Sequence, residues 1–365
     1  MKRAIAVSST ICILAFASSA YSADTAFIDQ SGVSHIPSVE IPYSDLASRQ
    51  QREQFIRAAQ RRLSQPRNQE PLTKDNAQKF NDSLNEEAKS GIAKLNKTFN
   101  VTTVASKIGG VPVYVSTPND GIAPENRDLV LLNLHGGSFV VNSGALAQVG
   151  AIPIAGLGKI KVISVDYRQA PKYQYPSATK DVESVYVSLI HRYKPQSVGI
   201  LGCSTGALLT AETTAWLNHN GLPTPGAIGI FGEGAVVNAG DSNYSQPILM
   251  GRIPSPSHSA IPLESELYFP ASAAKDALAF PAEKPEILAH FPPTLLISGT
   301  RDIGLSQVVV THARLVRAGV DADLHVWEGA THCAYASTSG SYDIPENREA
   351  WSVIVNFFRK HLHGK

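Results

Sequence analysis

The stretch Gly202-Cys203-Ser204-Thr205-Gly206 decides how this sequence folds. An apolar run at 198–201 precedes it, and a helix-like run at 207–218 follows it. A buried strand, a sharp turn with a central serine, and then a helix form the setting of a nucleophile elbow. Strain in such a turn lifts the serine hydroxyl away from the edge of the sheet, and the flanking glycines let neighbouring backbone pack closely. We therefore predict that Ser204 is a nucleophile.

A second loop, His135-Gly136-Gly137-Ser138, follows a strand-like run at 129–134. Backbone N–H groups at a pair of glycines are free to point at a substrate oxygen. We therefore expect the N–H groups of Gly136, Gly137 and Thr205 to form an oxyanion hole.

Two further strand-like runs each end in a loop that carries a candidate catalytic side chain. The first, at 294–298, leads to Asp302, and the second, at 323–328, leads to His332. A serine hydroxyl needs a base within hydrogen-bond reach, and imidazole changes charge near neutral pH. We predict that His332 is this base and that Asp302 fixes its tautomer. Serine, then aspartate, then histidine is also the chain order of an α/β-hydrolase triad.

With these residues in place, the chain from about 111 to 361 resembles the hormone-sensitive-lipase-like family of α/β-hydrolases, in the branch of the bacterial carboxylesterases. The His-Gly-Gly loop carries the resemblance, together with Asp166-Tyr167-Arg168-Gln169-Ala170-Pro171 and the strand from Pro292 to Asp302. The sequence departs from the family pattern at Ser138, where the family has a third loop glycine, and at Cys203 and Thr205 of the elbow.

The resemblance implies a serine carboxylesterase that hydrolyses small-molecule esters through an acyl-enzyme on Ser204. It also implies that His135 is a structural residue that hydrogen-bonds within its own loop rather than a second base. Two alternatives stay open. The same triad could hydrolyse lactones or amides, or the chain could be a non-catalytic ligand-binding protein on a hydrolase scaffold. Glu233, which follows a strand ending at Phe231, either lines the pocket or packs within its loop.

Two cysteines, Cys203 and Cys333, remain in the sequence after an N-terminal leader. Each is the neighbour of a predicted triad residue, and the triad would bring those residues together. Such a pair can form a disulfide in an oxidising compartment. The arrangement is similar to the Cys-Ser…Asp…His-Cys pattern of tannase-like and feruloyl-esterase-like hydrolases, in which the disulfide ties nucleophile to base. We predict the Cys203–Cys333 disulfide; the alternative is two unpaired thiols.

The first 23 residues are typical of a signal peptide. Lys2 and Arg3 precede an apolar stretch at 4–17, and small residues at 18–23 suit cleavage. We therefore expect an exported protein, periplasmic or extracellular. Residues 24–110 are predicted to be an N-terminal extension with cap helices, one opened by a capping box at Ser48 and a second at 73–95. A solvent-facing extension is the alternative for these helices.

Residues 111–365 are predicted to form the catalytic domain. Strand-like and helix-like runs alternate here, which favours a mostly parallel central sheet with helices on both faces. The stretch at about 238–290 interrupts the alternation and is expected to add to a helical cap and pocket wall. The formal net charge of +1 gives no sign of a nucleic-acid partner or an anionic membrane. No later segment resembles a membrane anchor, and no metal-ligand spacing occurs, so we predict neither metal nor cofactor.

Overall fold

The computed structural model describes residues 25–363, apart from 31, 39, 65–71, 238–239, 253–262 and 337–340. The predicted signal peptide and part of the predicted insertion lie outside the described residues. The chain divides into two units at residues 42 and 43. The first unit contains a short antiparallel hairpin of β1 (Phe27–Ile28) and β2 (Ser34–His35). The second unit contains the central sheet.

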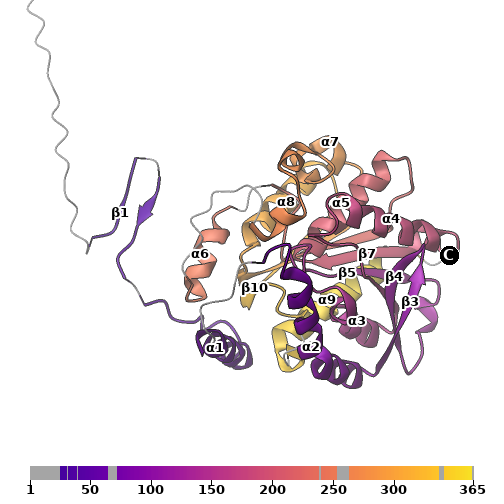
Figure 1. The fold of residues 1–365 in the computed structure, drawn as a ribbon, viewed down its shortest axis with the longest axis horizontal. Helices are drawn as coiled ribbons and strands as arrows, with labels where there is room; N and C mark the ends of the chain where they lie inside the picture. The colour runs from indigo at the N-terminus through magenta and orange to yellow at the C-terminus, as the bar shows by residue number, and fades with distance from the viewer. Residues whose placement is uncertain are drawn as a thin grey trace, which may run out of the picture. The chain divides into compact units, whose positions relative to one another are not determined.

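The central sheet has eight strands in the order β10-β9-β8-β7-β5-β6-β4-β3 (Figure 1). From β10 to β6 neighbouring strands run parallel, whereas β4 pairs antiparallel with both β6 and β3. The predicted mostly parallel sheet is therefore confirmed. The strands are β3 Val101–Ile108, β4 Val111–Pro118, β5 Val130–Leu134, β6 Lys161–Val165, β7 Val198–Cys203, β8 Ala227–Phe231, β9 Thr294–Arg301 and β10 Ala322–Thr331.

The sheet starts at Val101, ten residues before the predicted start of the catalytic domain at residue 111. The predicted boundary between residues 110 and 111 falls inside the hairpin of β3 and β4, whose turn is Gly109-Gly110, both at positive φ. β3 is an edge strand with one buried residue, Val101. Its sequence therefore lacks the apolar alternation that reveals a half-buried strand.

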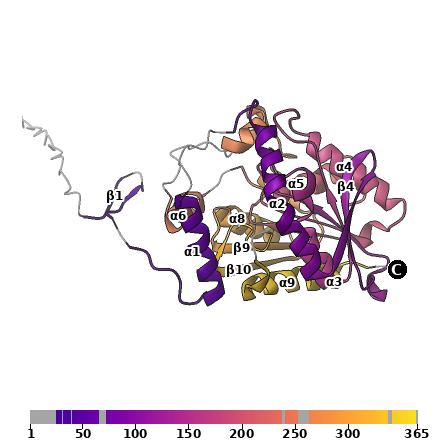
Figure 2. The same cartoon turned by 60° about the horizontal axis from the view of Figure 1, so that its bottom comes forward.

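Helices cover both faces of the sheet (Figures 1 and 2). The helices are α1 Arg49–Ser64, α2 Ala77–Phe99, α3 Ala151–Gly158, α4 Ser177–Ile190, α5 Thr205–His219, α6 Ser242–Leu249, α7 Pro285–Leu288, α8 Leu305–Arg317 and α9 Pro345–His361. Alternate residues of one strand enter different cores. Ile200 of β7 packs with residues of α4, α5 and α8, whereas Leu201 packs with residues of α2, α3 and α9. This period of two follows from the pleat of a strand that is buried on both faces.

Helix α1 begins as predicted, but only half of the capping box forms. The Gln51 backbone N–H donates to Ser48 Oγ at 3.1 Å. The reciprocal acceptor for the Ser48 N–H is Glu346 Oε1 of α9, at 2.6 Å, rather than Gln51. The box therefore also joins α1 to α9. The second helix, α2, lies four residues later than the predicted 73–95, and its C-cap, Asn100, has a left-handed conformation.

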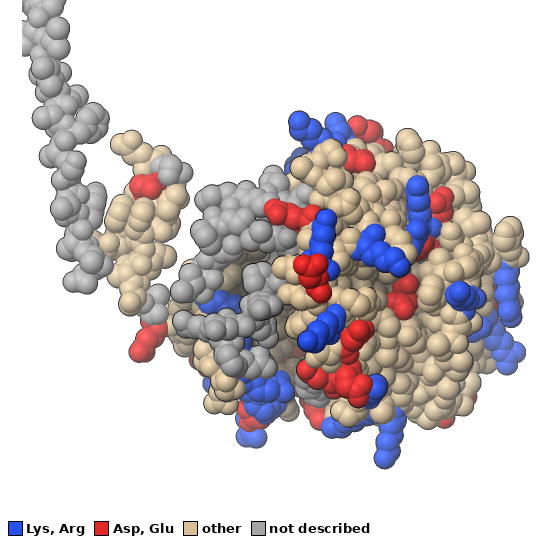
Figure 3. Space-filling view, viewed as in Figure 1, with Lys and Arg blue, Asp and Glu red and all other residues tan. Residues whose placement is uncertain are grey.

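One face of the molecule mixes both signs of charge. On the face seen in Figure 3, lysine and arginine side chains lie among aspartate and glutamate side chains rather than in a separate patch. Within the ranges that the structure describes, no helix has the length and apolar character that a membrane span requires.

Candidate active site

The predicted site residues come together because their strands are parallel. Ser204 follows β7, Asp302 follows β9, and His332 follows β10. These strands lie within one run of four parallel strands, β10-β9-β8-β7, so their carboxyl ends lie along the same edge. Ligand sites of open parallel sheets form at this edge.

Ser204 has the backbone conformation of a strained turn, with φ 58° and ψ −135°. Its N–H donates to Phe231 O of β8 at 2.9 Å, and α5 starts at the next residue. A Cβ at Gly202 would collide with the backbone of Gly206, and a Cβ at Gly206 would collide with the backbone of Leu134. Both glycines of the motif are thus required by close packing, as the sequence indicates.

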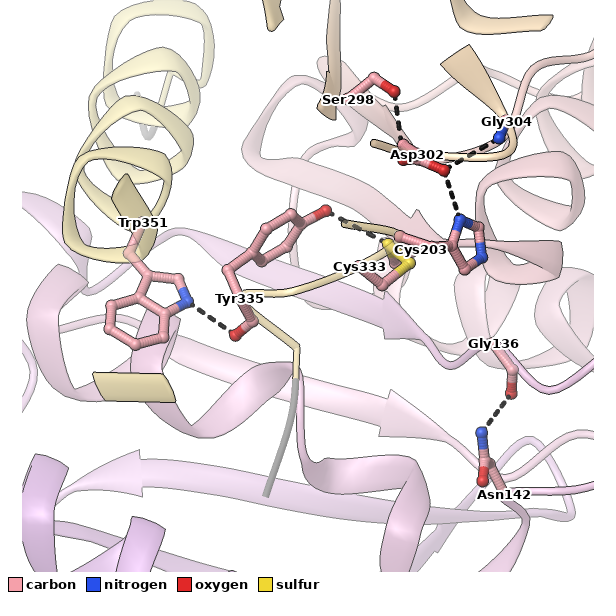
Figure 4. Close-up of a disulfide and its surroundings, with 10 residues drawn as sticks. Gly136, Asn142, Cys203, Ser298, Asp302, Gly304, Cys333, Tyr335 and Trp351 are labelled. Atoms are coloured by element: carbon pink, nitrogen blue, oxygen red, sulfur yellow. Dashed lines mark hydrogen bonds and ion pairs between the residues drawn. A yellow bond between two sulfur atoms is a disulfide. The ribbon is translucent and has the colours of Figure 1, made fainter. Parts of the chain in front are cut away.

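The His332 ring is bonded to a buried carboxylate. Its Nδ1 lies 2.7 Å from Asp302 Oδ1, and Asp302 is 1% exposed (Figure 4). Asp302 also accepts the Gly304 N–H at 2.9 Å and the Ser298 hydroxyl at 3.1 Å. Because a carboxylate accepts from Nδ1–H, the neutral ring keeps its lone pair on Nε2.

The charge state of His332 depends on its neighbours. Burial opposes the charged imidazolium, but the Asp302 carboxylate and its hydrogen bond outweigh burial, and Glu233 adds to their effect. The pKa of His332 is therefore raised above the ordinary value of 6.5. Glu233 itself lies in a half-buried position just after β8.

The glycine loop after β5 lies against the serine. A Cβ placed at Gly136 would be 2.9 Å from Ser204 Cβ and 3.6 Å from Ser204 Oγ, so only glycine allows this approach. Gly137 has a φ of 118°, which a side chain would rarely adopt. Thr205, the third predicted donor, is buried at the first residue of α5.

His135 has the structural position that the family resemblance implies. Its Nδ1 lies 2.8 Å from Gly136 O, and its ring stacks on Tyr167 with centroids 4.2 Å apart. The Tyr167 hydroxyl in turn donates to His135 O at 2.6 Å. Burial lowers the pKa of His135, so its ring is held neutral within the loop.

Cys203 and Cys333 form a disulfide, with their Cα atoms 6.1 Å apart (Figure 4). The Tyr335 hydroxyl donates to Cys203 Sγ at 3.3 Å, and Trp351 Nε1 of α9 donates to Tyr335 O at 3.2 Å. The disulfide therefore joins the end of β7 to the loop after β10, and α9 supports that loop. The sequence motif indicates the cysteine pair but gives no sign of Tyr335 or Trp351.

Two other sequence features have structural roles. The Asp166 carboxylate accepts the Gly144 N–H at 2.9 Å, and the Arg168 guanidinium pairs with Asp181 of α4.

A cavity of about 230 Å³ lies beside the glycine loop and is lined by Asn133, His135, Gly136, Asn142 and Cys203, among others. Over the described ranges, no cluster of three histidine, cysteine, aspartate or glutamate side chains is arranged to hold a metal ion.

Comparison with known proteins places this geometry in a family. A family model described as the alpha/beta hydrolase fold matches residues 131–336. The crystal structure of an esterase, E25, is 31% identical with a TM-score of 0.77, over 90% of this chain and 98% of that one. The structure of an esterase from the bacterial hormone-sensitive lipase family is 25% identical with a TM-score of 0.69, over 87% of this chain and 100% of that one.

Curated relatives match over shorter spans. Versiconal hemiacetal acetate esterase of Emericella nidulans is 30% identical over 32% of this chain and 39% of its own length. Carboxylesterase/phospholipase LipF of Mycobacterium tuberculosis is 25% identical over 65% of this chain and 63% of its own length. The chain thus spans less than two thirds of either relative. The family model and the solved structures together show that the chain belongs to the α/β-hydrolase fold family, in its hormone-sensitive-lipase branch.

Proposed function

We propose that this chain is a serine carboxylesterase that hydrolyses carboxylic esters through an acyl-enzyme on Ser204. The observation that carries the proposal is the 2.7 Å bond between His332 Nδ1 and Asp302 Oδ1. His332 lies on the loop after β10, and the disulfide joins Cys333 of this loop to Cys203, the residue that precedes Ser204. The bond to Asp302 leaves Nε2 as the basic nitrogen of His332. The disulfide holds the His332 loop beside the turn that carries Ser204.

The proposed reaction has two half-reactions. Ser204 Oγ attacks the ester carbonyl carbon while His332 Nε2 takes the hydroxyl proton, and Asp302 stabilises the imidazolium that forms. The bond to the alcohol oxygen then breaks, and His332 gives its proton to the leaving alcohol. A water molecule attacks the acyl-enzyme in the same way, releases the acid and restores Ser204.

The negative charge of each tetrahedral intermediate falls on the former carbonyl oxygen. We propose that the backbone N–H groups of Gly136, Gly137 and Thr205 receive it, because Gly136 lies against Ser204 and Thr205 follows it. Loss of one such donor costs about 3 kcal/mol of transition-state stabilisation.

Substitution of the triad tests this proposal. Ser204→Ala and His332→Ala should each remove nearly all hydrolysis of p-nitrophenyl acetate and butyrate, because the residues act in one step. Asp302→Asn should be severe as well, because the amide favours the wrong His332 tautomer. Ser352→Ala and His219→Ala, at exposed positions of α9 and α5, serve as matched controls. Near wild-type turnover in Ser204→Ala would refute the proposal.

Labelling separates the alternative functions. An organophosphonate should modify Ser204 stoichiometrically, as shown by mass spectrometry of the Ser204 peptide. A non-catalytic binding protein would not react. A panel of esters, lactones and anilides then distinguishes ester from lactone or amide hydrolysis. One curated relative, arylacetamide deacetylase of Rattus norvegicus, is 32% identical over 127 residues, so the anilide arm is informative.

We also infer that the protein is exported. The inference rests on the signal-peptide pattern of residues 1–23 and on the Cys203–Cys333 pair, because disulfides persist in oxidising compartments. Cell fractionation and N-terminal sequencing of the mature protein test it. Recovery of the full-length chain with free thiols in the cytoplasmic fraction would contradict it.

A further inference from the structure

Glu233 occupies a special place in the sheet topology. In the strand order, β8 lies between β7, which leads to Ser204, and β9, which leads to Asp302. The loop that leaves β8 at Gly232 and Glu233 therefore begins between the proposed nucleophile and the proposed acid. Because the carboxyl ends of parallel strands share one edge, this loop starts at the same edge of the sheet as the loops of Ser204, Asp302 and His332.

Contacts of the preceding glycine establish how close this loop lies. Gly232 has a φ of 68°, and a Cβ placed there would be 3.3 Å from Asp302 Oδ2. It would also lie 3.1 Å from Cys333 Sγ and 3.3 Å from Cys203 Sγ. A Cβ at Gly304, just beyond Asp302, would lie 3.3 Å from Glu233 Cα. The loop thus packs between the disulfide and the acid loop.

The Glu233 carboxyl has titratable neighbours but no fixed partner among the described residues. His332 and Asp302 face it from the loops after β10 and β9, Glu212 from α5, and Tyr167 from the segment after β6. Among the residues that the structure describes, it forms no hydrogen bond and no ion pair with lysine or arginine. Asp302, in contrast, is held by His332, Gly304 and Ser298.

We propose that Glu233 is a positioning residue that acts through His332, as a second carboxylate that stabilises the imidazolium formed when Ser204 attacks. This inference rests on the proposed function, in which His332 is the base. Glu233 acts on the charge of the ring, whereas Asp302 fixes the tautomer and orientation of the ring.

The titration of Glu233 makes this role dependent on pH. Burial raises the pKa of Glu233, attraction by His332 lowers it, and repulsion by Asp302 raises it, with a result of about 7. Above this pH Glu233 is a carboxylate that raises the pKa of His332 and favours the imidazolium of the transition state. Below it Glu233 is neutral and contributes little. The two groups therefore titrate as a coupled pair.

The substitution Glu233→Gln removes the charge and keeps the shape. The second-order rate of Ser204 phosphonylation and kcat/KM for p-nitrophenyl acetate are measured between about pH 5 and pH 9. We expect the midpoint of the acid limb to move down by about 0.5 to 1 pH unit, because His332 loses a favourable charge. The rate on the alkaline plateau should fall about 3- to 10-fold, because a shift of one unit in the pKa of His332 corresponds to a tenfold change in the stability of its imidazolium.

Controls separate this role from a structural one. Glu286→Gln, an exposed carboxylate of α7, should leave the profile unchanged, and Glu233→Asp should keep the wild-type midpoint. A Glu233→Gln profile that is scaled at every pH by one factor, without a shift of its midpoint, would overturn the inference. If the wild-type profile shows no ionisation in this range, His332 is not the base and the proposed function itself fails. If Glu233→Gln lowers the melting temperature, phosphonylation of the folded fraction still reports the midpoint.

Discussion

At the scale of single residues, the site depends on one unfavourable backbone conformation. Ser204 has φ 58° and ψ −135°, a region that residues with a side chain rarely adopt. The turn is maintained by its surroundings, because its N–H is bonded to Phe231 O and α5 starts at the next residue. Ser204 is the single residue between the end of β7 and the start of α5, so the chain turns at the residue that carries the hydroxyl. We interpret the strain as the cost of exposing the nucleophile.

The strain can be measured by comparing two inactive variants. Ser204→Ala and Ser204→Gly both remove the hydroxyl, but only alanine retains a Cβ at positive φ. Such strain costs of order 1–3 kcal/mol, and the greater freedom of glycine in the unfolded chain offsets part of it. We expect the glycine variant to unfold at a free energy about 1 kcal/mol higher than the alanine variant. Equal urea midpoints for the two variants would show that the turn is relaxed.

Glu212 is a second residue whose environment is unfavourable. It is fully buried on α5, accepts one hydrogen bond from Thr179 Oγ1 at 3.0 Å, and its Oε1 has no partner among the described residues. Burial raises its pKa well above the ordinary value, and Glu233 and Asp276 add to this effect. The folded state therefore retains a proton that the unfolded chain releases as the pH rises.

The sign of the pH effect follows from this difference. A raised carboxyl pKa contributes stability below the unfolded pKa, and this stability is lost as the pH rises toward the folded pKa. Glu212→Gln abolishes the titration and keeps an acceptor for Thr179. Between pH 5 and pH 8, the free energy of unfolding of the variant should gain on the wild type by up to about 1.4 kcal/mol per pH unit. A difference that is constant with pH would contradict this, and Glu286→Gln is the exposed control.

At the scale of elements, the end of β10, which precedes His332, is bonded to α1 and to the segment before α1. The Tyr43 hydroxyl donates to Gly329 O at 3.0 Å, and Gln51 Nε2 donates to Glu328 O at 2.6 Å. Ser48 is bonded to Glu346 of α9 through both its N–H and its hydroxyl. Segments far apart in the chain thus hold the end of β10 a few residues before His332. We infer that α1 contributes to activity by fixing this loop.

Gly329 is the position at which this support can be disturbed. It has a φ of 71°, and a Cβ there would lie 2.7 Å from Tyr43 Oη and 2.9 Å from both Ala47 Cβ and Gln51 Nε2. Gly329→Ala should therefore push α1 away and lower kcat about tenfold, because small displacements of catalytic groups are costly. Gly319→Ala is the matched control, because it has a φ of 83° and its Cβ would meet no atom within 4 Å.

The two variants share the cost of a left-handed alanine, roughly 1–2 kcal/mol. Both should therefore lose melting temperature, but only Gly329→Ala should also lose turnover at a temperature where each protein is fully folded. An equal loss of turnover in both would mean that the contact with α1 has no effect on the site.

The elements also show what the sequence can predict. The strands that lead to Ser204 and Asp302 are recognisable because each is a buried apolar run that ends in a motif. β10, which leads to His332, is a half-buried edge strand, and the motif at its end is what reveals it. β3 is missed because an exposed edge strand needs few apolar residues. The bond from Gln51 to Glu328 joins a side chain to a backbone carbonyl 277 positions away, so it leaves no periodic or motif signal. Glu233 is visible in the sequence, but only the strand order places it between β7 and β9.

At the scale of the whole molecule, the disulfide closes the segment from residue 203 to residue 333 into one covalent loop. It joins residues 130 positions apart, and β8, β9 and β10 lie inside the loop. The two cysteines come together only when those strands have taken their places in the sheet. The cross-link is therefore coupled to the tertiary fold and to the geometry of the site.

The double variant Cys203→Ser with Cys333→Ser tests both effects. A loop of 130 residues corresponds to at most about 5 kcal/mol of stabilisation from the entropy of the unfolded chain. We expect a lower free energy of unfolding in urea, and a loss of kcat that reaches about a hundredfold if the His332 loop shifts by about 1 Å.

Wild-type protein treated with a phosphine reductant should approach the variant in both measurements, and the variant should not respond to the reductant. The sheet keeps its own strand pairing after reduction, and Trp351 of α9 still bonds Tyr335 O. Activity should therefore fall before the sheet unfolds. A reduced wild type that keeps full activity and an unchanged urea midpoint would show that noncovalent contacts alone position His332.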